Sequence, residues 1–302
     1  MQKHSCDRLG QWLDQRAGLL LSLPALLLLL AFVILPFTMA VYASFTNQSV
    51  RTFMQPGTLA YVGWDNYREL LGDGDFGQAL FNTMYFVALV VPLQVGLALA
   101  LAVLVNGAEM WRRMLRISFF MPVITSMAVL AVVWTLLFNP GAGVFNTLLR
   151  ALQLSPQPFL SSPRQAMLCL AAMSVWQGVG FQMMIFLAAM QSIPPALYEA
   201  ARIEGAGRWQ CFRRITLPML KNTTIFVVYI TTVFAFKLFV QPHLITQGGP
   251  RGSTRTLILM LYDEAFTNMR YGKAAAISVM FFVLVLLVTF VQRRLMPREE
   301  RL

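Results

Sequence analysis

Polar side chains inside apolar stretches are the groups of this chain that could act on a solute. The stretch 167–189 is otherwise apolar and contains small or polar positions and one indole: Ser174, Trp176, Gln177, Gly178, Gly180 and Gln182. Polar atoms surrounded by lipid are costly, so they either line a polar path or, as is more frequent, bond to a neighbouring helix. Both alternatives remain open for this stretch.

Lys237 is the only charged side chain well within an apolar stretch, near the middle of residues 223–244. An unpaired ammonium group in lipid would cost about 3 kcal/mol or more. We therefore expect Lys237 to face the interior of a helix bundle, a water-filled path or an anionic group. Snorkelling and pairing with another subunit are the alternatives to a role in a path.

The sequence lacks the usual signatures of an enzyme. Its only histidines are His4 and His243, and no His/Glu or Ser/His/Asp constellation is visible. The phosphate-binding motif Gly-x-x-x-x-Gly-Lys-[Ser/Thr] is absent, because Gly272-Lys273 is followed by Ala274. We expect no catalytic residue, no metal site, no cofactor bound by this chain and no ATP hydrolysis by it.

The elements that position these side chains are expected to be membrane-spanning helices. Of 302 residues, 57% are hydrophobic and 12% are charged, which is too few charges to cover a soluble globule. A span needs roughly 20 apolar residues. Six stretches qualify, at residues 19–42, 80–105, 118–138, 167–189, 223–244 and 274–291. The sequence predicts an all-α integral membrane protein with six transmembrane helices in a single domain, residues 1–302.

The charge distribution orients these six spans. Of 24 Lys and Arg, fifteen lie in the amino-terminal tail, in residues 106–117 and 190–222, and after residue 291, whereas eight lie in the other loops. The positive-inside rule places the richer side, with both termini, in the cytoplasm. The net charge of +11 is spread over segments beside membrane ends, which favours anionic membrane lipid over nucleic acid as its partner.

A polar segment, residues 194–218, separates the fourth and fifth stretches. Pro195 suits the first turn of a helix, where its missing N–H does no harm. Gly205 and Gly207 can turn the chain, and Trp209, Phe212 and Ile215 then recur every three residues. These features predict a cytoplasmic helix, a turn and a second short helix. By periodicity alone, an interfacial amphipathic helix without a partner fits equally well.

The pattern Glu199-Ala200-Ala201, with Gly205 four places on, Phe212 and then Pro218, resembles the docking loop of binding-protein-dependent ABC importer permeases. Four further segments are similar to the carbohydrate-type permeases of the maltose and glycerol-phosphate branch: residues 61–67, 79–83, 191–194 and 244–250. Relatives often carry Asp where this chain has Glu204.

The resemblance implies two groups of functional residues. The coupling helix would enter a cleft of an ATP-binding subunit, through Glu199, Ala200, Ala201, Gly205, Phe212 and Pro218. The positions that match solute contacts of maltose-type permeases are Ser174, Gly178 and Phe181, to which we add Gln177 and Lys237 as candidates for the substrate path. An aromatic ring beside a glycine gap suits the C–H face of a sugar.

The resemblance also implies a function and a set of partners. The chain would be a multi-pass subunit of an ATP-driven importer in the bacterial inner membrane, forming half of the path for a carbohydrate or polyol. Its partners would be a second homologous permease, a pair of cytoplasmic ATP-binding subunits that bind ATP and magnesium, and an extracytoplasmic solute-binding protein. An ion-driven secondary transporter is the alternative, although such proteins commonly place Asp or Glu in their spans and these spans contain neither.

Overall fold

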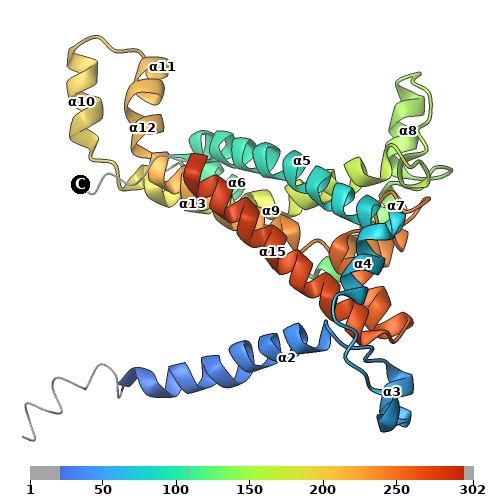
Figure 1. The fold of residues 1–302 in the computed structure, drawn as a ribbon. Helices are drawn as coiled ribbons and strands as arrows, with labels where there is room; N and C mark the ends of the chain where they lie inside the picture. Colours follow the sequence, from blue (N-terminus) through green and yellow to red (C-terminus); the bar gives the residue numbers. More distant parts are fainter. Residues whose placement is uncertain (1–20, 108, 296–302) are drawn as a thin grey trace, which may run out of the picture. The chain divides into compact units, whose positions relative to one another are not determined.

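The computed structural model describes residues 21–107 and 109–295, and helices dominate this part of the chain (Figure 1). Within it, the only strand-like pairing is an isolated bridge between Thr46 and Tyr61. His4, the start of the stretch 19–42 and both termini lie outside the described residues. The prediction of an all-α membrane protein is confirmed.

Four described helices are long and apolar enough to cross a membrane, namely Leu21–Ala43, Gly74–Val105, Ala166–Gln191 and Tyr271–Leu295. Two further candidates are bent pairs of helices. Met110–Ile124 and Met127–Leu137 meet at 102°, and Arg208–Met219 and Lys221–Phe236 meet at 64°. If each bent pair is one span, these helices correspond to the six stretches expected from the sequence.

The chain divides into two compact units. The first comprises residues 1–70 and 264–280, and the second comprises residues 71–263 and 281–302. Described elements of the first unit are η1 (Leu30–Ile34), α2 (Leu35–Ala43), α3 (Val50–Met54), η2 (Pro56–Thr58), most of α4 (Asp65–Gly72) and of η6 (Asp263–Thr267), and the start of α15 (Tyr271–Leu295).

Ion pairs hold the first unit together around the start of α15. The Lys273 Nζ lies 2.9 Å from the Glu69 Oε1, and the Arg270 Nη2 donates to the Glu264 Oε1 over 2.8 Å. Lys273 and Glu264 are both buried, so pairing satisfies charges that would be costly alone. The helix Leu21–Ala43 has none of its most apolar window buried within the chain.

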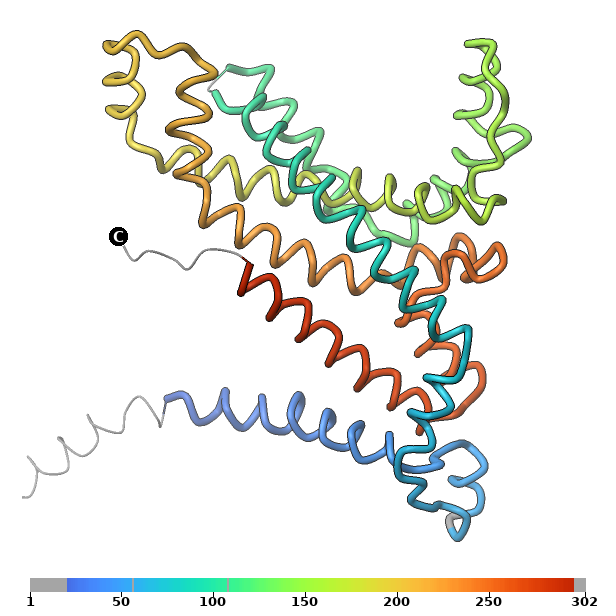
Figure 2. The backbone as a smooth tube through the Cα atoms, turned by 45° about the horizontal axis from the view of Figure 1, so that its top comes forward, coloured from blue at the N-terminus to red at the C-terminus, as the bar shows by residue number. Residues whose placement is uncertain are grey.

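The second unit contains the remaining helices and every candidate functional residue named above. Its elements are α5 (Gly74–Val105), α6 (Met110–Ile124), α7 (Met127–Leu137), α8 (Val144–Ala151), η3 (Phe159–Ser161), α9 (Ala166–Gln191), α10 (Pro195–Ile203), α11 (Arg208–Cys211), η4 (Phe212–Thr216), α12 (Leu217–Met219), α13 (Lys221–Phe236), η5 (Pro242–Thr246), α14 (Leu257–Tyr262) and the end of α15. Figure 2 follows their course as a tube.

The core of the second unit lies between α5 and α9, with α13 and α6 packed against them. Ala98 and Ala102 of α5 have no exposed surface, and such small residues allow neighbouring helices to pack closely. Larger side chains, including Met183 of α9 and Val227 of α13, fill the rest of the core. The opposite face of α5 exposes leucines, as expected for a helix that faces lipid.

The third stretch is not one continuous helix, because α6 ends at Ile124 and α7 begins at Met127. Pro122 lies near this end of α6 and removes one helical N–H group. The Thr125 hydroxyl donates to the Met121 carbonyl over 3.1 Å, and the Thr125 N–H donates to the Pro122 carbonyl. These bonds satisfy carbonyls that the broken helix leaves without a helical partner.

Gly180 of α9 sets the distance between α9 and α6. A Cβ at this position would overlap the carbonyl group of Phe119, which belongs to the backbone of α6 and cannot rotate away. The glycine therefore permits direct backbone contact between α6 and α9 within the second unit.

We predict that Gly180→Ala destabilises the chain by about 1–3 kcal/mol, because a rigid backbone must shift to admit the new methyl group. Gly96→Ala in α5 is the matched control, since no atom lies within 4 Å of its added Cβ. It should leave stability unchanged or raise it. Thermal unfolding of the purified protein in detergent would measure both, and equal melting temperatures would contradict the predicted clash.

Candidate functional site

A cavity of about 500 Å³ lies among α5, the α6–α7 break, α9 and the end of α13. Four of its lining residues are phenylalanines: Phe86, Phe181, Phe234 and Phe239. Its polar lining residues are Gln94, Ser174, Gln177, Gln182, Thr231, Lys237 and Gln241. None of the residues that line it is Asp or Glu, so the described wall carries amides, hydroxyls and one cation.

The structure brings the five predicted path residues together on this wall: Ser174, Gln177, Gly178, Phe181 and Lys237. The Phe181 ring lies 6.3 Å from that of Phe234, measured between centroids, with the planes inclined at 58°. The first four residues come from α9 and Lys237 follows α13. Their grouping is what a solute path requires, and their role in one stays a prediction.

Two of the α9 polar groups also bond to the segment that contains α13. The Ser174 hydroxyl donates to the Leu170 carbonyl over 2.8 Å and accepts a hydrogen bond from the Gln241 amide over 2.9 Å. Gln182 is almost fully buried, and its amide donates to the Thr231 hydroxyl over 3.2 Å. Hydrogen bonding between neighbouring segments, the more frequent explanation of such groups, thus uses part of the hydrogen-bonding capacity of Ser174 and Gln182.

One buried acceptor on the cavity wall has no donor. The Gln182 Oε1 is buried and receives no hydrogen bond from any described residue. A buried carbonyl left unpaired costs about 1–3 kcal/mol, so the arrangement favours a donor supplied from within the cavity. Gln94 and Gln177 also make no side-chain hydrogen bond with the described residues, which leaves further amide groups for a ligand.

Gln94 and Gln241 were not identified as site residues from the sequence. Gln94 lies on α5 with 6% of its surface exposed, and its amide occupies the space that a Cβ at Gly178 would need. The signal was present, because Gln94 is an amide well inside the apolar stretch 80–105, as Gln177 is inside α9. Gln241 could have been found by its position four residues after Lys237.

Lys237 does not lie within a helix, as the stretch 223–244 had suggested, because α13 ends at Phe236. Pro242 explains the break. It has no N–H to offer the carbonyl of Leu238, and its ring would clash with that carbonyl in a continuous helix. The Thr256 hydroxyl instead donates to the Leu238 carbonyl over 3.0 Å.

Lys237 is therefore the residue that caps α13, and it is exposed on the cavity wall. The negative end of a helix dipole stabilises a cation by about 0.3–1 kcal/mol. This is less than the cost of about 3 kcal/mol for an unpaired charge at membrane depth. Lys237 forms no ion pair with a described residue, so the helix end alone does not balance its charge.

The segment 194–218 forms a hairpin of helices, with α10 as one arm and α11, η4 and α12 as the other (Figures 1 and 2). The Tyr198 and Thr216 hydroxyls lie 2.9 Å apart and join the two arms. At the tip, the N–H of Ala206 donates to the carbonyl of Ala201, and Gly205 adopts a φ of +80°. This is the Schellman ending of a helix, which favours glycine at its left-handed position.

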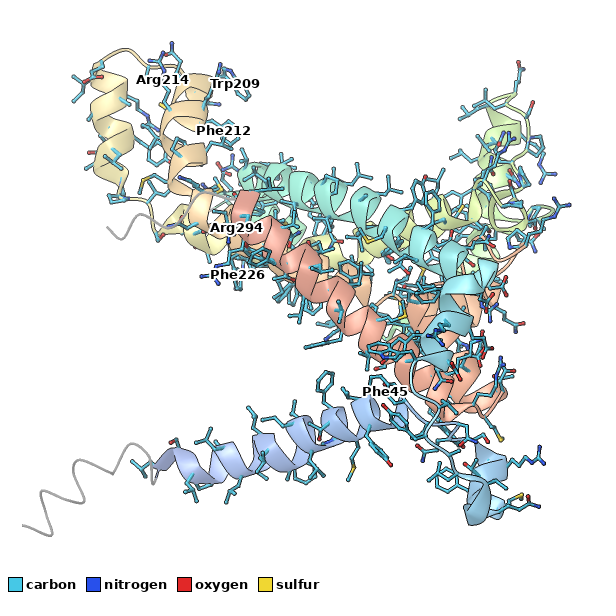
Figure 3. The ribbon with its side chains drawn as sticks, viewed as in Figure 1. Phe45, Trp209, Phe212, Arg214, Phe226 and Arg294 are labelled. Atoms are coloured by element: carbon cyan, nitrogen blue, oxygen red, sulfur yellow. The ribbon has the colours of Figure 1, made fainter. Side chains whose placement is uncertain are left out.

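The predicted coupling residues are spread over both arms of this hairpin. Glu199 and Ala200 are exposed on α10, and Ala201 is partly buried. On the second arm, the Phe212 ring packs against that of Trp209 (Figure 3), with 5.4 Å between the ring centroids. Pro218 is exposed on α12. The local fold expected from the sequence is present, and the coupling role of these residues stays a prediction.

The comparisons with known proteins identify the family. Residues 72–301 match the family described as binding-protein-dependent transport system inner membrane components. The chain belongs to this family. The probable ABC transporter permease protein YurN of Bacillus subtilis is 36% identical over 275 residues, which are 90% of this chain and 92% of that protein. The trehalose/maltose transport system permease protein MalF of Thermococcus litoralis is 33% identical over 279 residues, 92% of each.

A solved structure supports the same assignment. The permease is similar to a chain in the crystal structure of a bacterial alginate ABC transporter in complex with an alginate pentasaccharide-bound periplasmic protein. The TM-score is 0.78 at 25% sequence identity, covering 94% of this permease and 96% of that chain.

The permease is accordingly a multi-pass inner-membrane subunit of an ABC importer, as its sequence had implied. It is a transport subunit and not an enzyme, because ATP hydrolysis in such importers belongs to a separate subunit. Membership of this family sets aside the alternative of an ion-driven secondary transporter.

The tip of the hairpin offers a test of its geometry. Gly205→Ala should destabilise the tip by about 1–2 kcal/mol, because a side chain disfavours the left-handed conformation. Gly207 has a φ of −72° at the start of α11, so Gly207→Ser, a preferred residue at that position, is the matched control. Hydrogen exchange of the 195–216 backbone amides should accelerate in the first variant alone. Equal exchange in both variants would contradict the assigned tip.

Proposed function

We propose that this permease forms half of the translocation path for a carbohydrate or polyol, which an extracytoplasmic binding protein delivers. The observation that carries the proposal is the unpaired buried oxygen of Gln182 beside the unbonded amides of Gln94 and Gln177. A hydroxyl group can donate to the first and accept from the others. The Phe181 and Phe234 rings add apolar faces suited to the C–H surface of a sugar.

The names of similar proteins support this class of solute. MalF of Thermococcus litoralis is named for trehalose and maltose, and the similar solved transporter is described with alginate and a periplasmic protein that binds its pentasaccharide. The cavity volume of about 500 Å³ lies within the range of about 300–1,000 Å³ typical of small-molecule sites.

The partners follow from the one docking hairpin that the described residues contain. A second homologous permease would supply the other half of the path, and each permease would dock one hairpin on one of two cytoplasmic ATP-binding subunits. ATP and magnesium would bind in those subunits. Both termini and the hairpin would lie in the cytoplasm, where Lys and Arg are concentrated beside anionic membrane lipid, and no nucleic acid would bind.

The hairpin would act as a lever. When the two ATPases close, α10 would move with its partner, and the second arm would follow because Tyr198 and Thr216 join them. The arms continue into α9 and α13, which form two walls of the cavity. Tilting these helices relative to each other would change the access to the solute, as in other rigid-body transport cycles.

Glu199→Lys tests the coupling. The exposed carboxylate of α10 would lie in the contact with the ATPase, so reversing its charge should abolish solute-stimulated ATP turnover of the reconstituted importer. Membrane levels of the permease should not change. Glu199→Asp keeps the charge and should retain most of the turnover. Full turnover in Glu199→Lys would reject the docking role.

Gln182→Leu tests the cavity. Leucine removes an unpaired buried oxygen, so the thermal stability of the permease should stay the same or increase. Uptake of the solute should nevertheless fall about tenfold, as expected for the loss of one buried hydrogen bond. The Thr231→Val variant controls for loss of the Gln182 partner. Normal uptake by Gln182→Leu would leave that residue with a packing role only.

A further inference from the structure

Lys237 carries the only charge on the described wall of the cavity. The described carboxylates of the same unit are Asp73, Asp75, Glu109, Glu199, Glu204 and Asp263. None of them lines the cavity. Three of these six already form ion pairs: Asp75 and Asp263 pair with Arg255, and Glu109 pairs with Arg112. The cavity therefore holds a positive charge without a neighbouring negative one.

The residues closest to Lys237 in the chain do not supply a counter-charge. Val240 and Gln241 follow it on the cavity wall, and Gln241 is bonded to Ser174. The end of α13 contributes only a partial negative charge, equivalent to about half an elementary charge. A cation that is exposed in a low-dielectric cavity attracts an anion strongly.

The groups around Lys237 would also hold the rest of an anion. Gln94 and Gln177 can donate N–H groups, whereas the Gln182 oxygen can accept from a hydroxyl. Lys237 thus provides the charge, and the glutamines provide hydrogen bonds suited to the hydroxyl groups of the solute. We propose that the transported solute is an acidic carbohydrate or polyol whose carboxylate, phosphate or sulfonate group pairs with Lys237. This inference rests on the proposed carbohydrate function.

The test uses the complete importer, reconstituted in vesicles with its binding protein and ATPase. The probes are three acids and their neutral parents: D-glucuronate and glucose 6-phosphate against D-glucose, and glycerol 3-phosphate against glycerol. Uptake and stimulated ATP turnover are measured for each. We expect an acidic probe to be transported at least about tenfold better than its parent, the difference that one charge-assisted hydrogen bond provides.

Three variants assign this preference to Lys237 rather than to the binding protein. Lys237→Met should raise the KM for the acidic probe about tenfold, whereas Lys237→Arg should keep it near the original value. Val240→Asp retains the lysine but places a carboxylate three residues away. It should weaken transport of the acidic probe as Lys237→Met does. Membrane levels of each variant show whether the protein has folded.

The outcomes separate the two proposals. If the neutral parents are transported as well as the acidic probes, or better, the carbohydrate function stands and the acidic solute is rejected. An unchanged KM for the acidic probe in Lys237→Met also rejects it, and means that another subunit or lipid neutralises the lysine. If no probe in either set is transported or stimulates ATP turnover, the proposed carbohydrate function itself fails.

Discussion

A helix that breaks inside a membrane must satisfy its backbone without water, and this constraint governs the site. Non-helical backbone is tolerated at that depth only where it is buried in protein or lines a cavity. The α6–α7 break places Val123 and Met127 on the cavity wall, and the break after α13 places the segment from Lys237 to Gln241 there. Hydroxyl groups of Thr125 and Thr256 bond to carbonyls that these breaks release. Both helix breaks therefore contribute to the cavity wall.

The main helices could be predicted from the sequence, because long apolar stretches and clusters of charge are properties of neighbouring residues. The hairpin was predictable for the same reason, since Pro195 and Gly205 mark its start and its turn within one short segment. Both are local signals. The family resemblance added the functional meaning, which periodicity alone left undecided between a docking helix and an interfacial one.

The partners of the broken backbone and the complete wall of the cavity could not be predicted in this way. Pro242 marks the break after α13 locally, but the hydrogen bond to the Leu238 carbonyl comes from Thr256, 18 positions after Leu238. Likewise, Gln94 becomes a wall residue only because α5 packs against α9 beside Gly178. Contacts of this kind form only when segments far apart in the sequence pack together. The sequence therefore indicated several of the cavity residues but not the contacts among them.

The contact at Gly180 also constrains how the second unit can change shape. A backbone carbonyl of α6 fills the place where any other residue would carry its Cβ, so the backbones of the two helices are in direct contact at this level. Sliding either helix along the other would drive that carbonyl into the side chains of the next turn. We therefore expect α6 and α9 to move together as one rigid body, so that the cavity changes shape mainly by movement of α13 relative to them.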